Sequence, residues 1–269
     1  MPVEHYENFP VASLLLPRRL RQPIEVIYAF ARSADDFADE GDRTDTERLA
    51  LLDEYRTELD KIQSGETDLS PLFVKVAATA REHDLPLGLF RDLLDAFSQD
   101  VVKKRYATFA EVMDYCRRSA NPIGRLLVHL YERATPENLA HSDAICSALQ
   151  LINFWQDVEI DWAKDRVYLP QEDMARFGVV DHDIAARRCD PAWRELMKFQ
   201  CTRAREMLES GRPLTRALPG RMGLELRFVM AGGHAILNKI DAVQGDVFLH
   251  RPVVTKWDWL FLAPKALLA

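Results

Sequence analysis

The chain has 269 residues, 48% of them hydrophobic, so a sizeable core is expected and a disordered chain is not. Its formal net charge of −7 argues against general binding of nucleic acid. The start of the chain lacks a signal-peptide pattern, and no apolar run reaches the roughly 18 residues of a membrane-spanning helix. The four cysteines form no CxxC pair, which is typical of reduced thiols in a cytoplasmic protein.

Apolar residues repeat at intervals of three and four along most of the chain, and glycine is scarce. This pattern predicts an all-α protein. Three prolines mark the start, residues 7–23, which is expected to lie over the bundle until Pro23 opens the first helix. No repeat or low-complexity linker interrupts the chain, so residues 1–269 are interpreted as one domain. Helices are expected at 23–41, 45–63, 71–84, 87–104, 108–119, 121–134, 136–163, 191–212 and 220–243, with a less regular segment at 164–190.

The first predicted helix ends in an acidic cluster, Asp35, Asp36 and Asp39, directly after the apolar run IEVIYAFA. Positions four apart lie about 40° apart on a helix, so Asp35 and Asp39 share a face that Tyr28 and Arg32 continue backwards. Like charges one turn apart repel, so a cation is expected beside them. A solvated helix end is one alternative. A calcium loop is another, but alanine occupies one of its ligand positions and the pattern stays helical.

A second polar line, Asn153, Asp157 and Asp161, recurs every four residues in an otherwise apolar stretch, with Gln150 just before it. Such a helix belongs in the middle of a bundle, and its polar stripe should face an internal cavity because unpaired buried carboxylates are costly. Two facing acidic helices could clamp Mg²⁺ together with a substrate diphosphate. Cationic side chains should complete this site, and those near the motifs are Arg32, Arg117, Arg118 and Arg166. The absence of zinc-ligand spacing, GxGxxG, GxxxxGK[ST] and GxSxG disfavours nucleotide-binding and hydrolase folds.

These motifs resemble the squalene/phytoene synthase family over about residues 5–251. The stretch NFPVASLLLPRRLRQPIEVIYAFARSADDFADE resembles the family's N-terminal block with its first aspartate-rich motif. YCRRSANPIGRLL resembles a segment that lines the substrate tunnel, and QLINFWQDVEIDWAKDRVYLP resembles the second signature, QLxNxxRDxxEDxxxGRxYLP. The resemblance implies an all-α, single-domain helical bundle of the isoprenoid-synthase type with a central substrate cavity.

Carried over by position, the resemblance implies that Tyr115 lies near the reacting carbons and that Asp165 stands where the family has glycine. The implied ligands of several Mg²⁺ ions are Asp35, Asp36, Asp39, Asn153, Asp157 and Asp161. The predicted catalytic set is Asp35, Asp39, Tyr115, Asp157 and Asp161. With the arginines near the motifs included, the predicted diphosphate-binding set is Arg32, Arg117, Arg118, Arg166 and Tyr168. The predicted cavity residues are Tyr28, Ser119, Asn121, Gly124, Phe154 and Gln156.

Two departures from the family pattern bear on the reaction. Gln156 stands where the family has arginine, and RRSANPIG brings Ser119 and Asn121 into the tunnel segment. These features resemble the bacterial hydroxysqualene synthase branch of the squalene and hopanoid pathway. The resemblance implies ionisation of presqualene diphosphate and quenching of the rearranged cation by water, without a nicotinamide cofactor. One alternative is head-to-head condensation of two farnesyl diphosphates to presqualene diphosphate, squalene or dehydrosqualene. A remote alternative is a non-catalytic scaffold member.

The same resemblance implies a prenyl diphosphate substrate, no nucleic-acid partner and hand-over of the product to other enzymes of the squalene pathway. A cytoplasmic location is expected, with peripheral contact at the inner membrane surface as a further hypothesis. The candidate for that contact is the C-terminal stretch WDWLFLAPKALLA, although ordinary core packing is its favoured interpretation.

Overall fold

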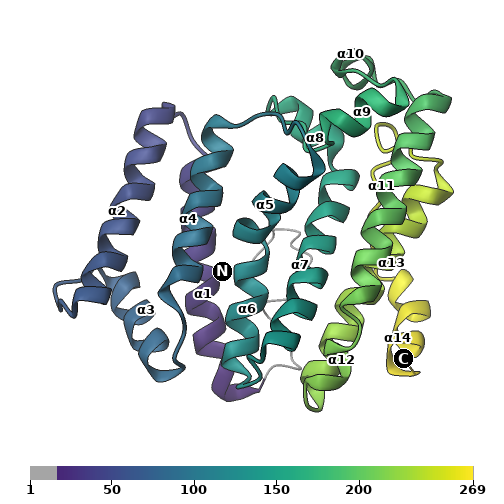
Figure 1. The fold of residues 1–269 in the computed structure, drawn as a ribbon. Coiled ribbons are helices and arrows are strands. Elements are labelled where there is room, and N and C mark those ends of the chain that lie inside the picture. Colours follow the sequence, from purple (N-terminus) through teal and green to yellow (C-terminus); the bar gives the residue numbers. More distant parts are fainter. Residues whose placement is uncertain (1–16, 269) are drawn as a thin grey trace.

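In the computed structural model, which describes residues 17–268, long helices run side by side as a bundle (Figure 1). No strand occurs in this range, and one isolated bridge joins Arg105 to Val167. Within it, no helix combines the length and the apolar character that crossing a bilayer would need. The helices are α1 (Arg18–Asp39), α2 (Asp45–Ser64), α3 (Pro71–Glu82), α4 (Leu87–Val102), α5 (Phe109–Ser119), α6 (Asn121–Leu130), α7 (Pro136–Gln156), α8 (Val158–Ala163), α9 (Gln171–Phe177), α10 (Asp181–Ala185), α11 (Pro191–Ser210), α12 (Leu214–Ala217), α13 (Arg221–Ala242) and α14 (Asp258–Leu268).

The all-α prediction is confirmed, but several elements differ from those expected, and the helix expected at 121–134 ends at Leu130. Helix α1 begins at Arg18, so Pro23 lies inside it, and the fully buried Leu20 anchors the additional turn on the core. The predicted helix at 136–163 is interrupted at Asp157, whose φ and ψ of −109° and 19° separate α7 from α8. The segment 164–190 contains the short helices α9 and α10. The predicted placement of residues 7–16 lies outside the described residues.

Helix α7 is the central element, as its apolar sequence predicts. It contacts α5, α6, α11, α12 and α13, and its buried residues run from Ser142 to Gln156. Helix α1 packs on α2, α3, α4 and α6. Helices α1 and α7 end at the same end of the bundle (Figure 1), so the acidic residues in the last turn of α1 and directly after α7 share that end.

The C-terminal stretch was expected to pack into the core, and this is wrong for part of it. It forms α14, which packs along α13 at the edge of the bundle, so only its inner side is covered. Trp257 and Phe261 remain 75% and 73% exposed. Apolar composition alone did not distinguish a core helix from an edge helix, because both kinds of helix are rich in large apolar side chains.

Helices α6 and α7 approach each other most closely at Gly124. A Cβ there would lie 2.4 Å from both Ser142 Oγ and Cys146 Sγ. The Gly124→Ala variant must move the buried Ser142 and Cys146 side chains or α7 itself, so we expect its free energy of unfolding to fall by about 1–3 kcal/mol in urea titrations. Gly88→Ala on α4 is the control, because a Cβ there meets nothing within 4 Å and should be neutral or mildly stabilising. Equal effects of the two substitutions would contradict the close approach at Gly124.

Candidate active site

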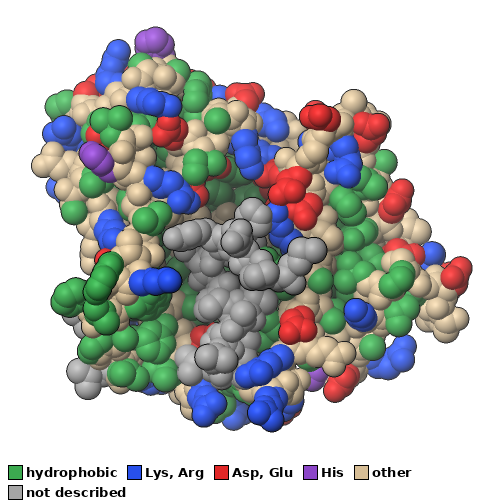
Figure 2. Space-filling model, turned by 180° about the vertical axis from the view of Figure 1, so that it is seen from behind, with side chains coloured by type: hydrophobic (Ala, Val, Ile, Leu, Met, Phe, Trp, Pro, Cys, Tyr) green, Lys and Arg blue, Asp and Glu red, His purple; other side chains and the backbone are tan. Residues whose placement is uncertain are grey.

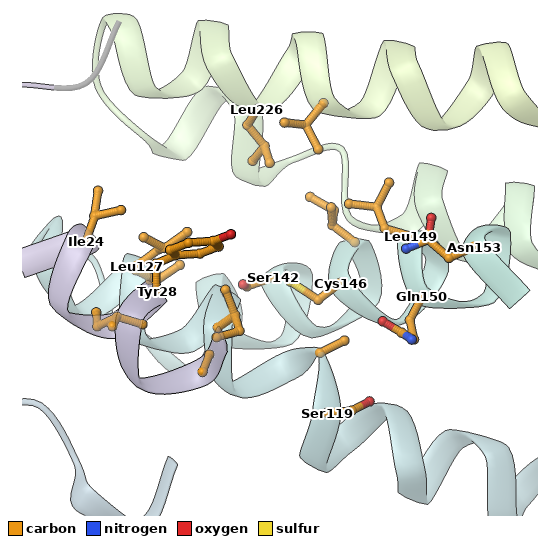
Figure 3. Close-up of a pocket in the computed structure, with 18 of the residues that line it drawn as sticks. Ile24, Tyr28, Ser119, Leu127, Ser142, Cys146, Leu149, Gln150, Asn153 and Leu226 are labelled. Atoms are coloured by element: carbon orange, nitrogen blue, oxygen red, sulfur yellow. The ribbon is translucent and has the colours of Figure 1, made fainter. Parts of the chain in front are cut away.

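A cavity of about 450 Å³ lies inside the bundle, with walls from α1, α5, α6, α7 and α13 (Figure 3). Ile24 and Asp35, about three turns apart on α1, both line it, so it extends about 16 Å along that helix. Ile24, Leu127 and Leu226 make one part apolar, whereas Gln150 and Asn153 point inward at the other end (Figure 3). The central cavity that the resemblance implied is present, with the shape of an apolar tunnel that ends among polar groups.

The two acidic motifs meet at the polar end. Asp35 from α1 and both Asn153 and Asp157 from the end of α7 line the cavity there. The segment after the second motif also reaches the first one: Lys164 Nζ lies 2.8 Å from Asp39 Oδ2, and Arg166 Nη2 lies 2.6 Å from Asp39 Oδ1. The structure therefore brings together residues that are more than a hundred positions apart in the chain.

Partly buried carboxylates crowd together at this end of the cavity. Burial, reinforced by the Asp39 carboxylate, raises the pKa of Asp35 to about 7. Burial, reinforced by Asp157, likewise raises the pKa of Asp161 to about 7. Burial opposes ionisation of Asp39 as well, but hydrogen bonds from Arg166 and Lys164 lower its pKa. Ionising Asp35 and Asp161 together at neutral pH thus calls for further positive charge at this site.

Arg32 connects the cavity with the rest of the first motif. Its side chain lines the cavity, and its Nη2 lies 2.7 Å from Asp36 Oδ1 and 2.7 Å from Glu40 Oε1. Asp36 is therefore held by an arginine of its own helix. This arrangement keeps a guanidinium next to the carboxylates at the mouth of the site, where an anionic ligand could exchange for one of them.

A buried hydrogen-bonding group that sequence reasoning missed lies beside the site. Asp100, on α4 and 5% exposed, accepts hydrogen bonds from Tyr115 Oη at 2.6 Å and from Tyr168 Oη at 3.1 Å. Arg166 Nη2 donates to its backbone carbonyl oxygen at 3.0 Å. Asp100 follows the apolar spacing of α4 one turn after Phe97, and a carboxylate on the buried face of a helix was the signal that could have revealed it.

The second missed residue is Arg251, which belongs to the loop between α13 and α14. Its Nε and Nη2 lie 2.6 and 3.1 Å from the two carboxylate oxygens of Asp157, and it lines the cavity. The neighbouring Gln156 donates from Nε2 to the carbonyl oxygen of Pro252 at 2.6 Å. The glutamine that replaces the family's arginine thus fastens the loop that presents Arg251. No sequence signal connects positions so far apart.

Two predicted diphosphate-binding residues lie elsewhere. Arg117 pairs with Asp114 and Asp92, and Arg118 pairs with Asp114 and with the Gln99 amide oxygen. Neither lines the cavity. Arg117 points to nearly the opposite side of α5 from Tyr115, whereas Arg118 lies only about 60° from it and is held outside the cavity by Asp114 and Gln99.

Two predicted cavity residues also face other surroundings. Asn121 is buried behind the wall, where its Oδ1 accepts a hydrogen bond of 2.8 Å from Ser147. Phe154 stacks on Tyr168 with ring centroids 3.8 Å apart, on the side of α7 away from the cavity. The other predicted cavity residues do line it, namely Tyr28, Ser119, Gly124 and Gln156.

Comparison with known proteins agrees with this arrangement. Residues 3–258 match the family model described as squalene/phytoene synthase. The chain belongs to the squalene/phytoene synthase family. Members of this family are prenyl-transfer enzymes of isoprenoid biosynthesis that bind prenyl diphosphates and use a divalent metal to ionise them. The all-α isoprenoid-synthase fold is therefore shown by the structure and by the family together.

Three relatives show which members of the family this squalene/phytoene synthase is similar to. The hydroxysqualene synthase of Rhodopseudomonas palustris is 35% identical over 87% of this chain and 79% of its own length. The 15-cis-phytoene synthase of Synechococcus elongatus is 29% identical over 97% of this chain and 88% of its own. The crystal structure of squalene synthase HpnC from Alicyclobacillus acidocaldarius superimposes with a TM-score of 0.83 at 38% identity, covering 89% of this chain and 90% of that one.

The donor atoms at the polar end fit the divalent metal of the squalene/phytoene synthases. No three carboxylate, histidine or cysteine side chains within residues 17–268 lie close enough together to hold an ion by themselves. Mg²⁺ in phosphate-transfer sites is held by one or two carboxylates, by waters and by the substrate's phosphate oxygens. Carboxylates on two facing elements, with raised pKa values at Asp35 and Asp161, match that chemistry.

Proposed function

We propose that this family member ionises presqualene diphosphate in a Mg²⁺-dependent reaction and that water quenches the rearranged cation to give hydroxysqualene. The observation that carries the water-quenching step is the Ser119 hydroxyl. It lines the cavity, is buried, and has no hydrogen-bonding partner among the described residues. A buried hydroxyl without a partner costs free energy, and a water held in the cavity would satisfy it.

Ser119 is well placed for such a role. It lies one turn after Tyr115 on α5, close to the polar end of the tunnel, and Gln150 points into the cavity from α7 (Figure 3). A hydroxyl and an amide could together orient one water toward the carbocation. Tyr28 and the apolar side chains beyond it would hold the hydrocarbon and keep other water away.

The remaining roles follow from the polar end. The metal ions would draw electron density from the diphosphate as it leaves. Asp35, Asp36, Asp39, Asn153, Asp157 and Asp161 are the proposed ligands. Arg32, Lys164, Arg166 and Arg251 now pair with four of these carboxylates and would turn toward the diphosphate oxygens once the carboxylates bind metal. The buried Tyr115 hydroxyl, held by Asp100, fixes its aromatic ring at the side of the reacting carbons.

The distribution of arginines supports a substrate with one diphosphate. A condensation of two farnesyl diphosphates needs cations for a second diphosphate. Arg117 and Arg118, two of the sequence candidates for diphosphate binding, are tied to Asp114 outside the cavity, and a neutral Gln156 stands where the family has arginine. The condensing reaction remains the second candidate, because the cyanobacterial phytoene synthase aligns over nearly the whole chain.

Product analysis separates the two candidates. Purified protein with Mg²⁺ and without nicotinamide cofactor would be offered presqualene diphosphate and farnesyl diphosphate in separate reactions. Hydroxysqualene from the first and little product from the second is the expected result. Presqualene diphosphate or a C30 hydrocarbon formed from farnesyl diphosphate would establish the condensing reaction instead. Turnover of neither substrate would favour a non-catalytic member.

The Ser119→Ala variant tests the water-quenching step. We expect the share of hydroxysqualene among the products to fall at least about fivefold in favour of hydrocarbons, because a cation without an oriented water loses a proton instead. Diphosphate release should change by less than about threefold, since the metal site is untouched. The control is Ser142→Ala, the same substitution further along the same cavity. An unchanged product ratio in Ser119→Ala would remove Ser119 from the proposed step.

A further inference from the structure

The outer face of α14 is an exposed apolar stripe at the end of the chain. We define it as Trp257, which directly precedes the helix, with Leu260, Phe261, Pro264 and Leu267. Trp257, Leu260, Pro264 and Leu267 are three or four positions apart, and Phe261 directly follows Leu260. Its large side chains are between 58% and 75% exposed. In Figure 2, hydrophobic side chains gather at the lower left, where α14 lies in this reversed view. Isolated exposed apolar residues are ordinary on protein surfaces, but a contiguous stripe of this size marks an interaction site.

The opposite face of α14 already has its packing partner. Trp259 lies against Phe228 of α13 with ring centroids 6.0 Å apart and passes over Gly232, and Ala266 is buried. Helix α14 is therefore apolar on both faces, unlike an ordinary amphipathic helix at the surface of a bundle. Folding of the chain accounts for the inner face and leaves the outer face without a covering element within the described residues.

The charges around this stripe favour an anionic or neutral surface as its partner. Asp258 is the sole acidic residue of positions 247–269, and Lys239 Nζ pairs with it at 2.7 Å. The same positions include Lys256 and Lys265, whereas Arg251 pairs with Asp157 at the cavity and does not belong to the stripe's surroundings. This end of the molecule is thus locally cationic in a chain of net charge −7. The C-terminal segment would be attracted to a negatively charged surface that repels most of the rest of the molecule.

We propose that the outer face of α14 docks on the surface of a lipid bilayer, with α14 lying in the interfacial plane. A helix with tryptophan, phenylalanine and leucine on the lipid side and lysines beside it is the usual form of such an anchor. Helix α14 lies at the edge of the bundle (Figure 1), and its exposed apolar side chains are at an accessible position for a bilayer surface. Tryptophan also prefers the depth at which hydrocarbon and headgroups meet.

The position of α14 relative to the cavity suggests that docking helps the product to leave. This role of docking rests on the proposed function. Met222, Leu226 and Val229 of α13 line the cavity, whereas Phe228 of the same helix packs on α14. Helix α13 thus lies between the tunnel and α14, and helix axes in contact are about 8–10 Å apart, so the proposed lipid face is two helix layers away from the tunnel. A C30 product dissolves poorly in water, so a tunnel held next to a bilayer would shorten its path to a hydrocarbon phase.

Vesicle binding tests the docking independently of catalysis. The full chain would be mixed with liposomes of phosphatidylcholine containing phosphatidylglycerol, and binding would be followed by flotation and by tryptophan fluorescence. Trp155 and Trp193 are fully buried, so a blue shift on binding would report mainly on the exposed tryptophans. The test variant is Leu260→Asp with Phe261→Asp. The control is Val74→Asp with Val102→Asp, two exposed apolar residues on α3 and α4.

We expect the wild type and the control to bind and shift, and the Leu260→Asp/Phe261→Asp protein to lose at least about tenfold in partition coefficient. Thermal unfolding should be unchanged in both variants, because all four substituted side chains are exposed. Turnover of detergent-dispersed substrate should also be unchanged, because none of the four residues lines the cavity. Failure of the wild type to bind liposomes, or equal binding by the test variant, would overturn the proposal. A concentration-dependent dimer that the same substitutions abolish would assign the face to a second copy of the chain. A wild type that binds vesicles without turning over any prenyl diphosphate would refute the proposed function alone.

Discussion

Replacing Asp39 with alanine is expected to lower Mg²⁺-dependent release of diphosphate at least about a thousandfold. Asp39 is the carboxylate at which the two motifs meet, since Arg166 and Lys164 both bind it. As a proposed metal ligand it offers the negative charge that holds the ion against the leaving diphosphate, and alanine offers none. Diphosphate release from presqualene diphosphate, measured over a range of Mg²⁺ concentrations, gives the result directly. Saturating Mg²⁺ should not restore the rate.

Two further variants separate loss of a metal ligand from loss of structure. Alanine at position 39 leaves the Arg166 guanidinium, which is only 10% exposed, without its carboxylate, so this variant should also unfold more easily. Asp39→Asn keeps an acceptor for that guanidinium and should lose about as much activity while staying closer to the wild type in stability. Asp42→Ala, an exposed residue just after the same helix, should behave as the wild type. Near-normal turnover in Asp39→Asn would refute the assignment of Asp39 as a metal ligand.

The periodic parts of the site could be predicted from the sequence. Asp35 and Asp39, and likewise Asn153 and Asp157, are four residues apart and follow mainly apolar stretches, so local helical geometry sends each pair to one side. A bundle has no other place for such a stripe than an internal cavity or a partner helix. The same reasoning identified α7 as the central helix, whereas the cavity residues Tyr28, Ser119, Gly124 and Gln156 came from the resemblance to the family.

What could not be predicted depends on contacts between distant positions. Arg251 reaches Asp157 over 94 positions, and Tyr168 reaches Asp100 over 68. No helical period relates such pairs. Proximity in sequence also misled: Arg117 and Arg118 stand beside Tyr115, yet neighbouring residues on a helix point in different directions. The break at Asp157 was hidden because the apolar pattern continues through it into α8.

Asp100→Asn is the second substitution with a large expected effect, and it tests the hydrogen-bonding group that the sequence did not reveal. The two oxygens of Asp100 accept one hydroxyl each, from Tyr115 and from Tyr168. An asparagine offers one oxygen, so one tyrosine loses its acceptor and its fixed position. We expect turnover to fall by about tenfold to a hundredfold. Asp95→Asn on the same helix, where the carboxylate pairs with Arg56 at the surface, should leave turnover unchanged. A wild-type rate in Asp100→Asn would show that the tyrosines are positioned by packing alone.

The pH dependence of stability gives Asp100 a signature that a purely catalytic residue would not have. Burial raises its pKa from 3.8 to about 6, although the hydrogen bond from Tyr115 opposes the shift. A carboxyl with a higher pKa in the folded than in the unfolded chain stabilises the fold while protonated, and this contribution is lost as the pH rises through about 6. When the pH is raised from 5 to 8, the free energy of unfolding of the wild type should therefore fall by roughly 1–2 kcal/mol more than that of Asp100→Asn. Asp35 and Asp161 titrate in both proteins, so the difference between two urea titrations isolates Asp100. Parallel losses in the two proteins would mean that its carboxyl is not held in a buried site.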